Sequence, residues 1–523
     1  MRKGKILISF VVVLALLTTA AGCGGNAGTS ATSAKDTLVF AQGADPRGLD
    51  PALVDDGESA KVIANVFETL VKYKEDSTEI EPCLATSWEK SADGKEWTFK
   101  LRRGVKFHDG TDFDAYAVKF TVDRQLPPQV TADMPYASFT FGPVKEVQVV
   151  DKYTVKFILK EPYAPFLANL AMSLAAPIVS PAAVKKYGDD FTNNPVGTGP
   201  YKFVKWDKGQ QVVLEANPNY WGPQPKMKKV VFKIVKENSV RASDLITGAV
   251  DIIDGVDPND VAKLEKSKML VAKDAGMNIN YMGFICDRPP FNNVKLRQAV
   301  SYAINKEELV KYLYKDLAQV APSMLPDFIP GYDPSLKGIP YDPEKAKQLL
   351  KEAGYPNGLK VKMITYSNPR PYNPVGGEKL AAAVQAQLAK VGIQAEIQSY
   401  PWKEYKDALF KVADGAQIFF YGWTGDNGDP DNFLSLLETK EIESSLNSAK
   451  YSNPQVDKLL VEGRTTLDMN RRIEIYKELQ KIVENEAPWV FISHGKTLAA
   501  YRPGVKNFKY HPTGVVHLWN VEK

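Results

Sequence analysis

The sequence predicts a protein of the mixed α/β class with at least two domains, and three observations support this expectation. Residues 359–421 alternate between strand and helix patterns, an order typical of parallel strands joined by helices. Of the 523 residues, 44% are hydrophobic and 24% are charged, which is the balance of ordinary globular proteins. A chain of this length exceeds one hydrophobic core, so we expect it to divide into domains.

The alternating region begins with a strand and a helix. Hydrophobic and polar residues alternate over 359–365, which predicts a strand. A helix is predicted over 378–391, because Leu380 and Val384 open a series at helical spacing and Gly392 ends it.

A second strand, a second helix and a third strand complete the region. Alternation over 393–398 predicts the second strand, which ends at Tyr400 and Trp402. A short helix is predicted over 403–412, and the apolar run 418–421 predicts a buried strand. The order β-α-β-α-β predicts neighbouring parallel strands with right-handed crossovers.

Charged and aromatic residues follow the ends of these strands. Arg370 lies in a proline-rich loop after the first strand, Trp402 follows the second, and Asp426 follows the third. In open α/β sheets, ligands bind outside the carboxyl ends of the strands. We therefore expect a fixed cation and a fixed anion to face one crevice, an arrangement that suits a zwitterion.

The loop 422–433 is acidic and rich in glycine. A solvated turn is the alternative interpretation, since Asn-Gly and Asp-Pro pairs are strong turn formers. Trp423 at the mouth of the loop favours a site that receives a small cation. A calcium hand is excluded, because Pro430 interrupts the loop and Leu437 stands where the terminal glutamate is needed.

Residues 1–22 are predicted to be a targeting segment. Three cations precede the apolar run 6–17, which is too short to span a membrane. The small residues before Cys23 resemble a bacterial lipobox, although Ala20 stands where leucine is usual. We expect cleavage and lipidation at Cys23, followed by a flexible tether over 23–35. Ordinary secretion, with Cys23 as a spare thiol, is the alternative.

The mature chain is nearly neutral and carries two further cysteines. Removal of the three leader cations leaves 63 lysines and arginines against 62 acidic residues, and no basic run alternates with aromatic residues. These features argue against a nucleic-acid partner. Cys83 and Cys286 are far apart in the sequence, and we expect no disulfide between them.

No catalytic, metal or cofactor motif is present. The chain has neither a phosphate-binding glycine loop nor a Gly-x-Ser-x-Gly elbow. Its four histidines, His108, His494, His511 and His517, form no metal-ligating pair. His108 precedes an Asp-Gly turn and is expected to be structural. We therefore expect a protein that is not an enzyme and needs no cofactor.

Several ordered motifs resemble those of family 5 extracellular solute-binding proteins, the receptor subunits of ABC importers for peptides and nickel. One of them is a predicted β-hairpin over 88–102, which turns at Asp93-Gly94. The matching segments are 49–52, 88–111, 195–201, 217–222, 296–304 and 341–346. Together they extend over essentially the whole mature chain.

Within that family, residues 370–374 and 422–433 look most like the dipeptide-binding branch. The resemblance implies that Asp426 pairs with the peptide α-ammonium and Arg370 with its carboxylate. It also implies ligand contacts in the same region, from Trp402, Tyr372, Trp423 and Gly425. Two fixed charges would select peptide length, since each residue adds roughly 3.3 to 3.6 Å.

The resemblance also implies a fold and a location. We expect a two-lobed α/β fold of the type II (cluster C) periplasmic-binding-protein kind, joined by two hinge strands. The larger lobe would contain 36–278 and 495–523, including an extra N-terminal subdomain, and the second lobe 279–494. The protein would be a monomer, anchored by lipid outside the cell membrane, serving ABC permease and ATPase subunits.

Other ligands and one other class of protein remain open at this stage. The same receptor role could serve a longer oligopeptide, a sugar or a nickel chelate, because one fold hosts several cargoes. A secreted metallopeptidase is the alternative from a different class. It would need histidine ligands near Asp426, and the neighbouring sequence has none.

Overall fold

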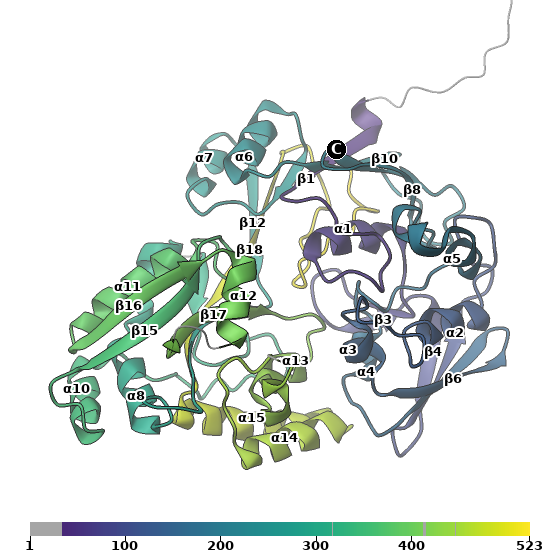
Figure 1. Ribbon diagram of the computed structural model, residues 1–523. Helices are drawn as coiled ribbons and strands as arrows, with labels where there is room; N and C mark the ends of the chain where they lie inside the picture. The colour runs from purple at the N-terminus through teal and green to yellow at the C-terminus, as the bar shows by residue number, and fades with distance from the viewer. Residues whose placement is uncertain (1–33, 316, 412–414, 445) are drawn as a thin grey trace, which may run out of the picture.

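The structure is a computed structural model that describes residues 34–523, except 316, 412–414 and 445. The predicted signal peptide, Cys23 and the tether up to residue 33 lie outside the described residues. Figure 1 shows two lobes side by side, with the chain passing between them near the centre of the molecule.

The first lobe is formed by the N-terminal half of the chain. Its strands and helices, in order, are β1 (Thr37–Gln42), α1 (Gly57–Val66), β2 (Val71–Tyr73), β3 (Ile80–Pro82), β4 (Ala85–Lys90), β5 (Glu96–Leu101), α2 (Ala115–Asp123), α3 (Ala137–Phe141), β6 (Val144–Asp151), β7 (Thr154–Leu159), α4 (Phe166–Asn169), α5 (Pro181–Tyr187), β8 (Tyr201–Asp207), β9 (Gln211–Ala216), β10 (Lys229–Ile234), α6 (Asn238–Thr247), β11 (Ile252–Asp254), α7 (Val261–Lys266) and β12 (Leu270–Ala275).

The second lobe follows, and the last strand leads back to the first. The elements are β13 (Asn278–Phe284), α8 (Val294–Ala303), α9 (Lys306–Leu309), β14 (Ala318–Val320), α10 (Pro343–Glu352), β15 (Leu359–Tyr366), α11 (Gly377–Ala389), β16 (Ile393–Tyr400), α12 (Trp402–Phe410), β17 (Ile418–Thr424), α13 (Asp431–Leu434), α14 (Pro454–Thr465), α15 (Met469–Glu486) and β18 (Trp489–Tyr501).

The predicted β-α-β-α-β region is confirmed as β15, α11, β16, α12 and β17. β15 pairs in parallel with both β16 and β17, so the three predicted strands are neighbours. The predicted hairpin is also confirmed, as the antiparallel pair β4 and β5.

One large sheet runs through both lobes. Its order is β16-β15-β17-β13-β18-β11-β1-β10-β9-β8, with β12 and β14 also paired to β18. β18 is the shared strand, because it pairs with β13 and β14 in the second lobe and with β11 and β12 in the first. The chain crosses between the lobes twice, once within β18 and once from β12 to β13. The two crossings are the hinge of a two-lobed protein.

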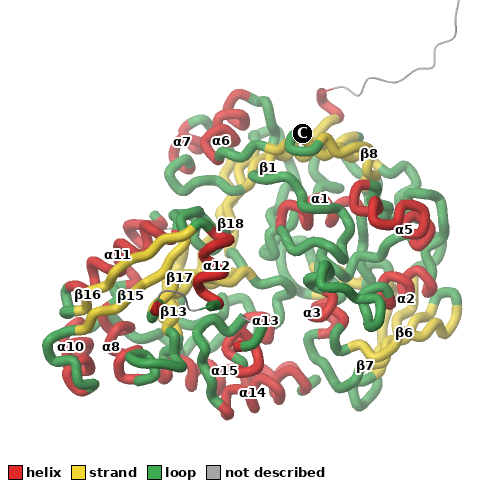
Figure 2. The backbone as a smooth tube through the Cα atoms, viewed as in Figure 1, coloured by secondary structure: helices red, strands yellow, loops and turns green. Residues whose placement is uncertain are grey.

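A four-stranded antiparallel sheet, β4-β5-β7-β6, and the small β2-β3 pair complete the first lobe. The tube view shows that the helices of the second lobe flank its strands (Figure 2). The segment after β18 returns to the core of the first lobe, where Val516 and Leu518 are fully buried.

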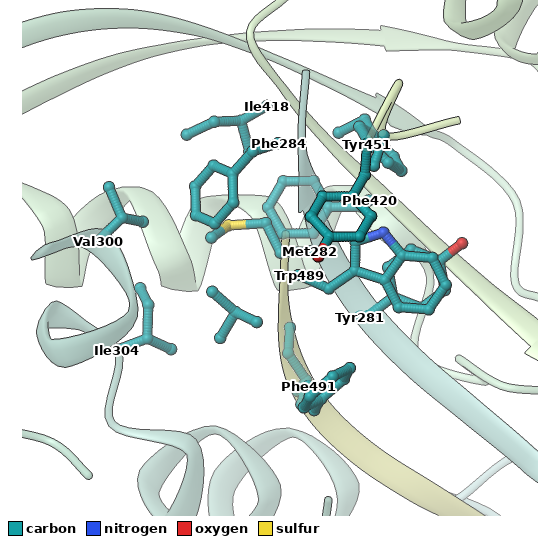
Figure 3. Packing of buried hydrophobic residues seen from close by; sticks show 14 of the residues in the cluster. Tyr281, Met282, Phe284, Val300, Ile304, Ile418, Phe420, Tyr451, Trp489 and Phe491 are labelled. Carbon is teal, nitrogen blue, oxygen red and sulfur yellow. The ribbon is translucent and has the colours of Figure 1, made fainter. Parts of the chain in front are cut away.

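Aromatic packing forms the core of the second lobe beside the hinge. Tyr281 of β13 stacks on Trp489 of β18 with ring centroids 3.7 Å apart (Figure 3). Phe284, Phe420 and the neighbouring aliphatic side chains are fully buried around this pair. Burial of such large side chains supplies much of the driving force that fixes the sheet.

Several helices begin at residues that the sequence marks as typical helix starts. Asp342 caps α10 by accepting from the backbone N–H of Lys345, and Pro343 occupies the first turn. Asp114 caps α2 in the same way. Among the described residues, no helix combines the length and the apolar composition needed to cross a membrane.

Candidate ligand-binding site

The candidate site lies where β15 and β17 end. These strands are parallel neighbours, with Ile364 opposite Phe419, so their carboxyl ends reach the same edge of the sheet. The loop that carries Arg370 follows β15, and the loop that carries Asp426 follows β17. Trp402 opens α12 directly after β16, which is the next strand along.

Asp426 is held by neutral hydrogen-bond donors. The Tyr136 hydroxyl donates to Oδ1 at 2.9 Å, and the Asn432 side-chain amide donates to Oδ2 at 3.1 Å. Burial raises the pKa of the Asp426 carboxyl to about 6. Within the described part of the chain, no lysine, arginine or histidine forms an ion pair with it. A positive group supplied from outside would therefore find an uncompensated carboxylate.

The other two acids of this loop are neutralised by arginines. Arg472 donates to both oxygens of Asp429, at 2.9 and 2.8 Å, and Arg464 lies 3.1 Å from Asp431. The expectation that the loop as a whole receives a cation is thus too broad. Of the three acids in this loop, only Asp426 lacks a charged partner within the described chain, and the two ion pairs hold the loop that positions it.

Trp423 and Gly425 shape the same loop. The Trp423 indole donates to Asn432 Oδ1 at 3.0 Å, and Asn432 in turn holds Asp426. The backbone N–H of Gly425 donates to the Met277 carbonyl at 2.7 Å, and a Cβ atom at Gly425 would lie 2.7 Å from the Phe433 ring. Glycine is therefore required by packing at this point.

Arg370 lies over an aromatic surface. Its guanidinium carbon is 3.9 Å from the centroid of a Trp402 ring, a cation–π contact. Trp402 is itself stacked on Tyr421, with rings 5.6 Å apart and an interplanar angle of 7°. No carboxylate of the described residues lies within ion-pair distance of Arg370, and its Nε is buried without a hydrogen-bond partner. Stacking thus positions the Arg370 guanidinium, and its Nε–H remains available to a ligand.

Tyr372 is more deeply buried than its place in a loop suggests. Its ring packs over Gly422, where a Cβ atom would come within 2.2 Å, and its hydroxyl has no hydrogen-bond partner among the residues that the structure describes. Tyr372 lies against Tyr366 and Tyr421, so it belongs to the aromatic cluster around Arg370.

Three residues of the first lobe complete the surroundings of the acidic loop, and sequence reasoning missed all of them. Tyr136 reaches Asp426, Asn169 accepts a 2.6 Å hydrogen bond from Asn427, and the Thr78 side chain lies against Gly428. No periodicity or motif marks these residues, because each acts through a contact across some 260 to 350 positions of the sequence.

Residues predicted to be structural behave as expected. His108 lies 3.0 Å from the Gly199 carbonyl, and burial lowers its pKa to about 4. Cys83 and Cys286 are free thiols. The described residues contain no group of three histidine, cysteine or acidic side chains that could hold a metal ion.

Comparison with known proteins agrees with this architecture. The sequence profile of bacterial extracellular solute-binding proteins, family 5 (middle region), matches residues 79–444. A dipeptide-binding protein of Escherichia coli is 35% identical, over 93% of this chain and 94% of its own length. The heme-binding protein A of Haemophilus influenzae is 36% identical, over 94% of this chain and 93% of its own length.

A solved structure shows the same fold. An ABC transporter-associated periplasmic binding protein of Helicobacter pylori, in complex with the peptide STSA, superposes with a TM-score of 0.79. It is 36% identical in sequence, and the match covers 93% of this chain and 98% of the other. Close relatives therefore share one fold while their names state different ligands.

Proposed function

This chain belongs to the bacterial extracellular solute-binding proteins of family 5, and on that premise we propose that it captures dipeptides for import. Proteins of this family are the binding subunits of ABC transporters and have no catalytic activity of their own. The ligand and the residues that hold it are the proposal.

One observation carries the proposal: two buried or half-buried charges of opposite sign, both without a charged partner among the described residues, follow neighbouring strands of one sheet. Asp426 would accept the ligand ammonium, and Arg370 would meet its carboxylate. An arginine fork can satisfy both carboxylate oxygens at once. A free peptide carries these two charges at its ends.

The aromatic residues have a second role in this arrangement. Trp402, Tyr372 and Trp423 surround the proposed anchors, while Gly425 allows the acidic loop to pack closely against Phe433 and Met277. Fixed anchors at both ends would reject longer peptides, which would leave one terminus unpaired. Side chains of the ligand would contact apolar surface and ordered water, which tolerates varied chemistry.

Lobe closure would complete the site. Tyr136 and Asn169 belong to the first lobe, and both bond to the acidic loop of the second. A ligand that contacts both lobes favours the closed arrangement by its differential affinity for that state. The closed receptor would then deliver the peptide to the permease and ATPase subunits of its importer.

We also propose the location and the boundaries predicted from the sequence. Lipidation of Cys23 would anchor the chain at the outer face of the membrane through the tether. Residues 36–278 and 495–523 would form the larger lobe and 279–494 the second. The two crossings between the lobes and the packing of the C-terminal segment into the first lobe support these boundaries.

The test is calorimetric titration of the mature protein, stripped of ligand by refolding, with four peptides: Ala-Ala, its C-terminal amide, its N-acetyl derivative and tetra-alanine. Ala-Ala should bind with a Kd of about 1 μM or tighter, a typical affinity for two desolvated charge pairs. Each blocked form and the tetrapeptide should bind at least about tenfold more weakly. Equal affinity for Ala-Ala and for both of its blocked forms would refute the proposal.

A further inference from the structure

A second cavity lies against the hinge. It has a volume of about 280 Å³, and both crossings contribute to its wall. Ala275 and Gly276 come from the end of β12, and His494, Gly495 and Lys496 come from β18. The segment 319–332 of the second lobe supplies the rest of the wall, and it begins in β14, which pairs with β18. None of the lining residues belongs to the proposed peptide site.

The charged residues of this cavity are not equivalent. Lys273 is already paired with Glu265 at 2.7 Å, and Asp327 is exposed to solvent. Lys496 is half-buried, and its ammonium has no partner among the described residues. Ala275 pairs with Lys496 across the strands, so the Lys496 side chain rises from the same face as Ala275 at the cavity wall.

The rest of the lining mixes polar and apolar groups. Pro322, Pro326, Phe328 and Tyr332 form its apolar part, and Phe328 is a large hydrophobic side chain with 38% of its surface exposed. Small-ligand sites commonly combine such an apolar wall with a few polar groups that fix orientation. A half-buried ammonium beside aromatic surface suits a small carboxylate with an apolar body.

Hydrogen bonds connect the cavity wall to the two crossings that form the hinge. His494 Nδ1 lies 2.7 Å from the Asn278 carbonyl. The Asn278 side chain spans the crossing, because it accepts from the Gly495 N–H at 2.8 Å and donates to the Gly495 carbonyl at 3.0 Å. A molecule seated between β18 and the segment 319–332 therefore touches the residues that join the two crossings.

We propose that this hinge cavity binds small aromatic or aliphatic carboxylates, with Lys496 as the anion anchor and Phe328 and Tyr332 as the apolar wall. Since β12 of the first lobe and the segment 319–332 of the second both contact the occupant, its binding is coupled to lobe closure. Coupling of this kind is reciprocal, so each ligand changes the affinity of the other by the same factor.

The probe is phenylacetate, titrated into the full mature protein and followed by ligand-observed NMR. It should saturate with a Kd of about 1 mM, typical of a ligand of this size. Phenethylamine, which has a similar ring and the opposite charge, should not bind. Lys496→Gln should weaken phenylacetate binding at least about tenfold, and Phe328→Ala should weaken it as well. Lys351→Gln, at an exposed lysine of α10, is the matched control and should bind as wild type.

Three results would overturn the proposal: no saturation, equal weakening in Lys496→Gln and Lys351→Gln, or phenylacetate binding that Arg370→Ala abolishes and Lys496→Gln leaves unchanged, which would place the probe in the peptide site. The coupling is tested separately, by titrating Ala-Ala with and without saturating phenylacetate, and an unchanged Kd would refute it. Failure of Ala-Ala to bind at all would count against the proposed peptide function and leave the phenylacetate titrations valid.

Discussion

Asp426→Asn is the most informative single substitution in this protein, because it removes a charge while keeping the hydrogen bonds around it. The new amide can place its oxygen toward the Asn432 amide and its nitrogen toward the Tyr136 hydroxyl, which can accept as well as donate. The loop is held independently by the Arg472 and Arg464 ion pairs. We therefore expect no rearrangement of the site.

The effect on binding follows from the lost charge pair. Removing one partner of a buried charge pair commonly costs about 2 to 5 kcal/mol. This range corresponds to a dipeptide affinity roughly 30-fold to a few thousandfold lower. Binding of the amidated and the free dipeptide should fall by the same factor, since the change is at the ammonium end.

Asp426→Asn is expected to weaken dipeptide binding but to stabilise the empty protein. Burial raises the pKa of Asp426 to about 6 in the folded, empty protein, whereas an unfolded aspartate has a pKa of about 3.9. The folded state therefore prefers the protonated form, and stability is lost as the pH rises through 6. One pKa unit corresponds to ~1.4 kcal/mol, so ionisation of Asp426 costs the empty protein up to about 3 kcal/mol at neutral pH. Asp426→Asn should recover part of this free energy.

Calorimetric titration and thermal melts at two pH values distinguish a ligand-binding role of Asp426 from a merely structural one. The empty variant should melt at the same temperature as wild type or higher at pH 7.5, and the difference should vanish near pH 4. A structural aspartate would lose stability on substitution at neutral pH. Unchanged dipeptide affinity, or a clear drop in the melting temperature of the empty protein, would refute the assignment.

Three further predictions concern the other anchor, the pH and the leader. Arg370→Lys should weaken dipeptide binding although the charge is kept, because an ammonium lacks the planar fork of a guanidinium. In competition assays, Arg370→Ala should discriminate far less than wild type between the acid and amide forms of one dipeptide. Dipeptide affinity of the wild type should rise as the pH increases from about 5 to 7, since the ligand ammonium needs an ionised Asp426, and titrations of Asp426→Asn should show a flat profile over the same range. The mature wild type should partition into detergent while Cys23→Ser is released or left unprocessed, and a wild type recovered wholly in the aqueous phase with a free N-terminus would contradict lipidation.

Local patterns predicted the elements of the second lobe well but not all of their ends. The strand that the sequence predicts from Ile393 to Tyr400 agrees with β16, whose backbone ladder with β15 continues to Tyr400. The strand predicted over 418–421, in contrast, continues as β17 to Thr424, because its backbone remains paired with β13. Backbone pairing is set by the neighbouring strand, so a side-chain pattern cannot show where it stops.

No local sequence pattern predicted how the two lobes are connected. β13 and β18 pair although some 210 residues separate Asn280 from Ser493 in the sequence. The resemblance to a known family implied the two hinge strands, and strand patterns alone did not. In the same way, Asp429 and Asp426 look alike in the sequence, and only the position of Arg472 on α15 distinguishes an ion-paired acid from a free one.

The acidic loop illustrates how a binding site can be stable and yet receptive. Two of its carboxylates are buried in ion pairs with arginines, which offset part of the cost of burying charge and hold the backbone. The third is buried with neutral donors only, and Arg370 likewise rests on an aromatic ring without a counter-ion. The empty site retains unfavourable electrostatic free energy at Asp426, which the ligand ammonium relieves on binding. Stability given up in the free protein thus reappears as affinity and as a preference for the closed lobes. If this account is right, Asp426→Asn should be more stable than wild type when empty and gain less stability from the dipeptide, whereas variants at Arg472 or Arg464 should lose stability with or without it.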